Sequence, residues 1–105
     1  MIDSESKQFQ MKEDNINKAS KALKAMGHPL RLKILCVIGE QELPVMDIVS
    51  QVGTTQSNIS QHIDILREKG IITSRREGSK ILCKVRDKTI LNLMGAMQQT
   101  FCQVD

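Results

Sequence analysis

The sequence predicts a mainly α-helical fold that carries one small β-hairpin. Glycine and proline divide the chain up to Gly70 into segments whose apolar residues recur three or four apart, the spacing of one helical face. Beyond Gly70 this spacing changes to two, as in a strand. The aromatic residues are Phe9 and Phe101 alone, so the core must be built from Leu, Ile, Val and Met, a composition typical of helices.

The 105 residues suffice for one domain, which a partner subunit would help to stabilise. Residues 1–13 are polar and lack a clear period, which predicts a flexible arm before a domain at 14–105. A first helix is expected from about Asp14 to Gly27. Its apolar residues share one face and are Ile16, Ala19, Leu23 and Met26.

A second helix is predicted immediately after the first. His28 precedes Pro29, which suits the first position of a helix, and Gly39 ends the segment. Apolar residues occupy most sides of this helix, so we expect it at the centre of the domain. They are Leu30, Leu32, Ile34, Leu35, Val37 and Ile38.

Two further helices, Pro44–Val52 and Thr55–Lys69, are predicted to form a helix-turn-helix. Gly53 separates them, and Thr54 or Thr55 can cap the second of the pair. Gly70 suits a left-handed C-terminal cap. One apolar stripe runs along the longer helix and consists of Ile59, Ile63 and Leu66.

The opposite face of the Thr55–Lys69 helix has an unusual composition. A solvated face is usually built from Lys and Glu, whereas short amide and hydroxyl side chains fill the first two turns here. They are Gln56, Ser57, Asn58, Ser60 and Gln61. Because Gln and Asn can pair with adenine edges, and Ser with phosphates or bases, this face predicts a helix that lies in a DNA major groove.

A basic β-hairpin is predicted after this helix. Residues 71–76 and 80–86 form the strands and residues 77–79 the turn, with Ile81, Cys83 and Val85 on one side. A basic hairpin directly after a recognition helix is a wing. Three cations lie near its tip, where they can contact phosphates or enter the minor groove, and they are Arg75, Arg76 and Lys80.

Positive charge is concentrated in this part of the chain. Residues 54–86 hold seven Lys or Arg against three acids, a local balance of +4. Residues 1–53 balance at zero and residues 87–105 at −1. This distribution is typical of a DNA-binding face and is less well explained by a scattered solvated surface.

A last helix is expected after Asp87, which can cap it. Its apolar residues cover more of its surface than an exposed helix tolerates. They are Ile90, Leu91, Leu93, Met94, Met97 and Phe101. We therefore expect this helix and the first to pack against a second subunit. The predicted fold is a winged helix-turn-helix of five helices and two strands.

Three separated blocks, at 28–35, 57–67 and 70–78, resemble the ArsR/SmtB superfamily of winged-helix repressors in order and spacing. The resemblance runs from about residue 18 to residue 102. It implies a homodimer joined through its first and last helices. It also implies that two recognition helices read an imperfect inverted repeat in double-stranded DNA.

The resemblance implies a role for individual residues as well. Base contacts are implied for Gln56, Ser57 and Gln61. Phosphate contacts are implied for Thr55, Asn58, Ser60, Arg75, Arg76 and Lys80. His62 stands where the superfamily often has His, and a structural or phosphate-touching imidazole is favoured there over a metal ligand.

The metal sites of the superfamily are not matched by this sequence. Pro44 and Met46 stand where one site places a Cys-x-Cys pair; Pro has no ligand atom, and a lone thioether suits few divalent ions. A second site needs His or Glu in the last helix, and residues 87–105 contain neither. The three cysteines with a His remain an open possibility, although their spacing matches no zinc template.

The cysteines suggest another signal. Cys36 and Cys102 match a pair found in a branch of the superfamily that resembles sulfide- and redox-responsive repressors, in which two thiols close into a disulfide or polysulfide bridge. Cys36 alone, within an apolar run, would be a small buried hydrophobe. Cys102 is expected to be partly exposed, and Cys83 is expected to pack. The implied effectors are reactive sulfur species or oxidants.

No catalytic constellation or cofactor fingerprint is evident, so an enzyme is not expected. The absence of a signal peptide and of a spanning apolar run predicts a soluble, cytoplasmic protein whose cysteines rest as thiols. A metal-responsive regulator is the alternative, as is a ligand-independent one that competes with another DNA-binding protein. A pure interaction module would leave the basic wing unexplained.

Overall fold

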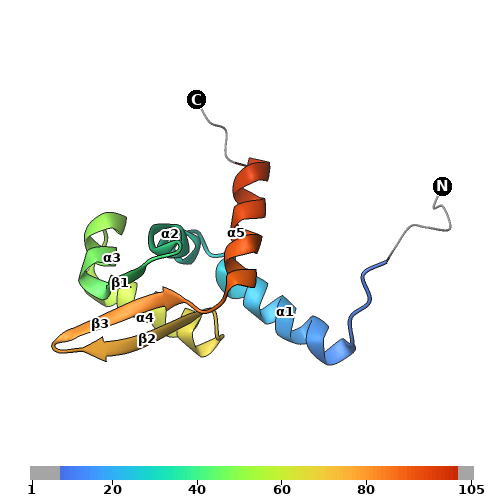
Figure 1. Ribbon diagram of the computed structural model, residues 1–105, viewed down its shortest axis with the longest axis horizontal. Coiled ribbons are helices and arrows are strands. Elements are labelled where there is room, and N and C mark those ends of the chain that lie inside the picture. Colours follow the sequence, from blue (N-terminus) through green and yellow to red (C-terminus); the bar gives the residue numbers. More distant parts are fainter. Residues whose placement is uncertain (1–7, 102–105) are drawn as a thin grey trace.

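A computed structural model describes residues 8–101 and shows five helices and a three-stranded antiparallel sheet in that range (Figure 1). The predicted winged helix-turn-helix is confirmed, but the number of strands was wrong by one. In chain order the elements are α1 (Glu13–Met26), α2 (Pro29–Ile38), β1 (Glu42–Pro44), α3 (Val45–Val52), α4 (Gln56–Glu68), β2 (Ile72–Glu77), β3 (Lys80–Val85) and α5 (Lys88–Phe101).

The additional strand, β1, overlaps the predicted helix Pro44–Val52 at Pro44 alone. Pro44 does not open α3; it ends β1 and is the N-cap of α3, with φ −61° and ψ 145°. A residue before proline favours extended backbone, and Leu43 accordingly lies in the strand opposite Cys83 of β3. The sheet order is β1-β3-β2, so Pro44 lies on an edge strand, where a missing N–H is tolerated.

The other boundaries lie within about one residue of the expected ones. Helix α1 begins at Glu13, one residue inside the predicted arm; residues 8–12 have no regular structure, and residues 1–7 lie outside the described range. Asp87 caps α5, because its Oδ1 accepts a hydrogen bond from the Ile90 N–H at 3.2 Å. Within the described residues, no helix is long and apolar enough to cross a membrane.

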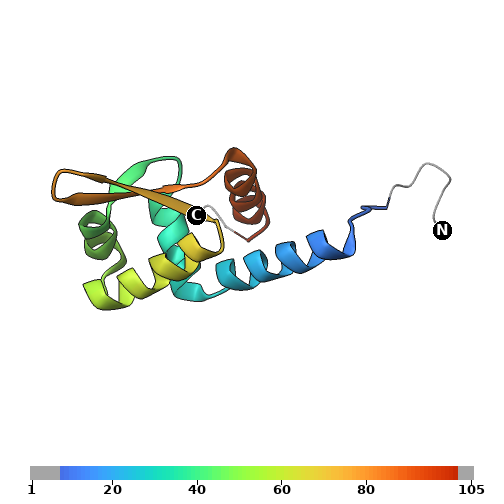
Figure 2. The same ribbon diagram turned by 90° about the horizontal axis from the view of Figure 1, so that it is seen from below.

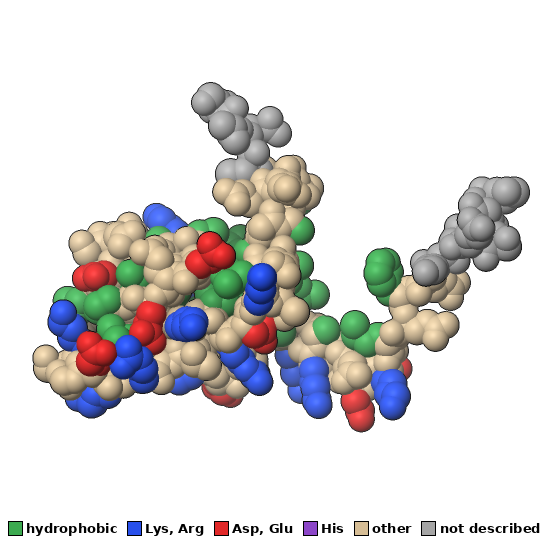
Figure 3. All heavy atoms as spheres, viewed as in Figure 1, with side chains coloured by type: hydrophobic (Ala, Val, Ile, Leu, Met, Phe, Trp, Pro, Cys, Tyr) green, Lys and Arg blue, Asp and Glu red, His purple; other side chains and the backbone are tan. Residues whose placement is uncertain are grey.

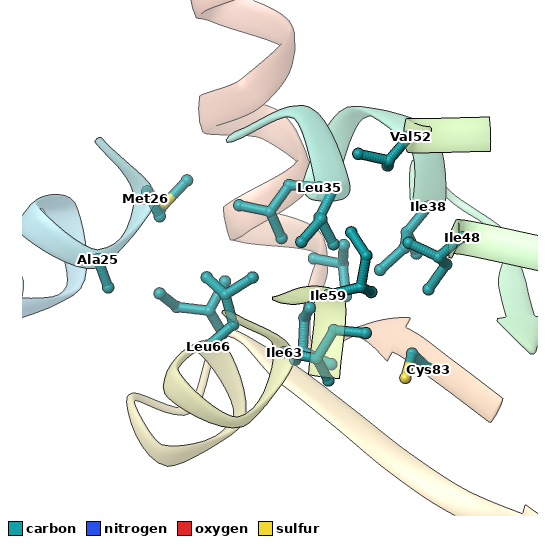
Figure 4. Close-up of a cluster of buried hydrophobic side chains, with 14 residues drawn as sticks. Ala25, Met26, Leu35, Ile38, Ile48, Val52, Ile59, Ile63, Leu66 and Cys83 are labelled. Atoms are coloured by element: carbon teal, nitrogen blue, oxygen red, sulfur yellow. The ribbon is translucent and has the colours of Figure 1, made fainter. Parts of the chain in front are cut away.

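The core lies between the helix-turn-helix and the sheet (Figure 4). Helix α2 supplies three fully buried residues and is central, as its composition predicts. The α4 stripe packs against it, and one face of the hairpin closes the other side. The residues with no more than 2% exposure include Ile34, Leu35, Ile38, Ile48, Ile59, Ile63, Leu66, Cys83 and Val85.

Helices α1 and α5 stand apart from this core. In both ribbon views α1 extends away from the helix-turn-helix (Figures 1 and 2), and Figure 1 shows α5 rising from the end of the sheet. No residue of α5 is buried within the chain. Apolar side chains therefore lie open along α5 and one side of α1 (Figure 3), among them Ile16, Leu23, Leu93 and Phe101.

Candidate nucleic-acid interface

Helix α4 presents free polar side chains on the side away from the core. Ser57 and Gln61 are exposed and four residues apart, so they form one stripe opposite the buried Ile59 and Ile63. Gln56 is exposed beside them. None of the side-chain hydrogen bonds between described residues engages Gln56, Ser57 or Gln61, which leaves their donors and acceptors available to an external partner.

The other polar residues at the start of α4 build the helix end. Thr55 Oγ1 accepts a hydrogen bond from the Asn58 N–H at 3.1 Å, the capping bond expected from the sequence. Asn58 Nδ2 donates to Thr54 Oγ1 at 3.3 Å. Both bonds fix the helix terminus, so Thr55 and Asn58 hold the stripe in place whether or not they also contact a phosphate.

A groove of about 530 Å³ separates α4 from the wing. Gln56 and the half-buried Ser60 line it from α4, and Lys80 and Ile81 line it from the hairpin. The tip of the wing therefore lies across the groove from the polar end of α4, which places both on the same part of the surface.

Arg75 and Arg76 lie on opposite faces of the wing. Arg76 pairs with Ile81, and these two share the face of the buried Cys83, which is turned toward the helices. Arg75 pairs with Leu82 and lies on the other face. Alternation along the predicted strand is enough to place these neighbours on opposite faces, and the structure adds that the Arg76 face is the one turned toward the helices.

The Arg75 guanidinium is held by two carboxylates. Its Nε and Nη2 donate to the two carboxylate oxygens of Glu42 at 3.0 and 2.8 Å, and its Nη1 donates to Glu77 at 3.0 Å. These hydrogen bonds raise the pKa of Arg75 and lower that of Glu42. Sequence reasoning missed Glu42, because it lies 33 residues from Arg75 and no local pattern links them.

His62 lies at the junction of α1, α2 and α4. Its half-buried ring is 4.6 Å from that of His28, and its Nδ1 is 3.2 Å from Arg31 Nη1. Arg31 Nε also donates to the Ala25 carbonyl at 2.6 Å. Burial, followed by the charges of His28 and Arg31, lowers the pKa of His62. These contacts join His62 on α4 to the start of α2.

Cys36 is exposed, which argues against the alternative that it is a small buried hydrophobe. Helix α2 turns Leu35 and Ile38 into the core and Cys36 to the opposite side, where it lines a groove of about 880 Å³ between α2 and α5. Phe101 lines the same groove. Cys102 is the next residue and lies outside the described range.

Cys83 has a different environment. It is fully buried on β3, and burial raises the pKa of its thiol, which disfavours the reactive thiolate. This agrees with the packing role expected from the sequence. Within residues 8–101, no group of three or more His, Cys, Asp or Glu side chains could hold a metal ion.

Comparison with known proteins identifies the relatives of this chain. The sequence profile described as "Bacterial regulatory protein, arsR family" matches residues 28–74. The chain is also 32% identical over 90 residues to the biofilm growth-associated repressor of Xylella fastidiosa, a match that covers 86% of this chain and 79% of the relative. The chain belongs to the arsR family.

Solved structures of two relatives share the fold of this arsR-family protein. HlyU from Vibrio cholerae matches with a TM-score of 0.82 and 32% identity, over 88% of this chain and all of that one. A second HlyU structure, described as reduced, has a TM-score of 0.80 at 32% identity and covers 87% of this chain and 96% of that one. The repressor BigR from Xylella fastidiosa matches with a TM-score of 0.78 and 30% identity, over 90% of this chain and all of that one.

The curated relatives are transcriptional regulators. HlyU of Vibrio cholerae is described as a transcriptional activator and is 31% identical over 97 residues, which covers 92% of this chain and 90% of the relative. This arsR-family protein is therefore a DNA-binding transcriptional regulator and not an enzyme. The α4 stripe and the wing are its candidate DNA surface.

Proposed function

We propose that this protein is a cytoplasmic, homodimeric repressor whose two α4 helices read an imperfect inverted repeat in double-stranded DNA. The observation that carries the proposal is the exposed stripe of Ser57 and Gln61, whose side chains have no partner among the described residues. Together with Gln56 they contact base edges. The phosphates are held by Thr55, Asn58, Ser60, Arg76 and Lys80. Arg75 is assigned a different role below.

The uncovered apolar surface supports the dimer. Leu23 is 54% exposed on α1, and Phe101 is 78% exposed on α5. Large apolar side chains left exposed on two helices are typical of a subunit interface. An interface through α1 and α5 sets the two α4 helices at the spacing of successive major grooves, about 34–36 Å.

The dimer is switched by reactive sulfur or oxidants through Cys36 and Cys102. The exposed Cys36 thiol lines the α2–α5 groove, and Phe101 at the end of α5 lines the same groove. One thiolate attacks the outer sulfur of an organic persulfide and releases the organic thiolate. The second thiolate then attacks the inner sulfur of the new cysteine persulfide, which forms a disulfide and releases hydrosulfide.

This bond would be strong enough to change DNA binding. It closes a loop of roughly 67 residues, worth about 4 kcal/mol in the chain-entropy estimate. A change of about 1.4 kcal/mol alters an affinity tenfold. Because α5 belongs to the proposed interface, fixing it to α2 changes the spacing of the recognition helices.

The test compares reduced protein with protein treated with an organic persulfide or with peroxide. A DNA duplex selected by the reduced protein from a random pool is the probe. We expect at least tenfold weaker binding after treatment, together with the mass of a Cys36–Cys102 bridge. Cys36→Ser and Cys102→Ser should each abolish the response, whereas Cys83→Ser should retain it. Equal affinities of the treated and reduced proteins would refute the switch.

A further inference from the structure

We propose that Arg75 is a positioning residue that acts on DNA binding through Glu42, by bracing the wing against the strand that leads into the helix-turn-helix. This inference rests on the assignment of α4 and the wing as the DNA surface. It removes Arg75 from the phosphate-contacting residues implied by the family resemblance.

The brace crosses the middle strand of the sheet. Glu42 lies on the edge strand β1 and Arg75 on the opposite edge strand β2, with β3 between them. Two parallel hydrogen bonds, of 3.0 and 2.8 Å, join the guanidinium to the Glu42 carboxylate, a geometry that fixes direction as well as distance. Of the ion pairs between described residues, this one alone joins β1 to β2.

The position of Glu42 makes this contact relevant to DNA. Pro44, two residues later, is the N-cap of α3, the first helix of the helix-turn-helix. The strand β1 is only three residues long, so few backbone hydrogen bonds hold it to β3. The side-chain bridge therefore fixes the wing relative to α3 and, through α3, relative to α4.

The existing partners of Arg75 argue against a direct contact with phosphate. Its Nε, Nη1 and Nη2 already donate to the carboxylates of Glu42 and Glu77. A phosphate would have to displace one of these carboxylates to bind the guanidinium. Arg76 lies on the opposite face, which is turned toward the helices, and the described residues offer it no carboxylate within ion-pair distance.

The direction in which Glu42→Gln changes the DNA affinity distinguishes a structural brace from a direct phosphate contact. Glu42→Gln removes a negative charge near DNA, so electrostatics alone predicts tighter binding. A brace predicts the reverse: we expect about fivefold weaker binding to the selected duplex for both Glu42→Gln and Arg75→Gln. Glu68→Gln is the matched control, because it also removes one exposed acid, and Glu68 forms no ion pair with another described residue. This variant should bind the duplex slightly more tightly than wild type.

The salt dependence supplies a readout that general destabilisation would not change. Loss of a phosphate contact lowers the slope of log affinity against log salt by about 0.9. Arg75→Gln and Glu42→Gln should keep the wild-type slope, whereas the slope of Arg76→Gln should be lower by about 0.9. The exchanged pair Glu42→Arg with Arg75→Glu should bind more tightly than Arg75→Glu alone, and circular dichroism checks that each variant is folded.

Opposite outcomes would overturn the inference. Tighter binding by Glu42→Gln, or a slope lowered by about 0.9 in Arg75→Gln, would make Arg75 a phosphate ligand. If α4 and the wing are not the DNA surface, Gln61→Ala and Arg76→Gln should also bind the duplex like wild type. This result separates an error in the DNA surface from an error in the role of Arg75.

Discussion

The two ends of this molecule differ in how completely the chain covers its own apolar surface. Around α2, α3, α4 and the sheet, Ile59, Ile63 and Leu66 are at most 1% exposed. Along α1 and α5, Leu23 is 54% exposed and Leu93 is 39% exposed. The DNA-binding end thus completes its own core, whereas the helical flank leaves apolar side chains uncovered, where the proposed dimer would bury them. In the proposed switch, a bond formed on the flank would therefore alter the dimer without unfolding the DNA-binding end.

The largest expected effect is a loss of stability in the core of the DNA-binding end. Leu66→Ala deletes a side chain with 0% exposure from the middle of the core and should cost about 2–5 kcal/mol of unfolding free energy. Urea denaturation followed by circular dichroism measures it. Gln61→Ala, on the exposed side of the same helix, is the control and should change stability by less than about 0.5 kcal/mol. Equal losses in the two variants would show that α4 is not packed as described.

An intermediate effect is expected at the flank. Leu93→Glu puts a charge on the apolar side of α5 and should weaken dimerisation by about 3 kcal/mol, roughly a hundredfold, with little loss of helix content. Sedimentation equilibrium measures the dissociation constant. Gln99→Glu, an exposed position on the same helix, should leave the dimer intact. An unchanged dissociation constant in Leu93→Glu would move the interface elsewhere.

The smallest expected effect is a pH dependence of stability caused by His62, which lies where the two ends meet. Its pKa is lowered below the ordinary value of 6.5, so the unfolded chain binds the proton more readily than the folded one. Stability should therefore fall as the pH drops below about 6.5 and level off below the folded pKa. Urea denaturation at several pH values measures the trend, and His62→Gln should flatten it. A wild-type slope retained in His62→Gln would assign the pH dependence to other groups.

The sequence predicts the bounds and the exposed face of α4 better than it predicts the contacts between elements. Helix α4 has a cap, a terminal glycine and a regular stripe, so its bounds and its exposed face follow from local rules. The strand β1 is three residues long and shows no period, so the sequence does not predict it, and its last residue, Pro44, is expected to open the next helix instead. The exposure of Cys36 could not be derived, because a helix with apolar residues on most sides does not reveal which side meets the core.

The bridge between Arg75 and Glu42 was missed for a related reason. Periodicity describes one element at a time, whereas this pair forms only after β1 and β2 have both joined β3. The same limit applies to His28 and His62, whose rings meet across two helices. Such contacts depend on the assembled fold, and no spacing in the chain encodes them.

The position of Pro44 also bears on how copies of this protein avoid each other. An exposed sheet edge invites a strand from another chain to pair with it, which is a common route to aggregation. The edge strand β1 ends in a residue without an N–H and carries a charged Glu42 two positions earlier. Proline and charge on an edge both discourage such pairing. Copies brought together at high concentration should thus not extend the sheet into a fibre through its β1 edge.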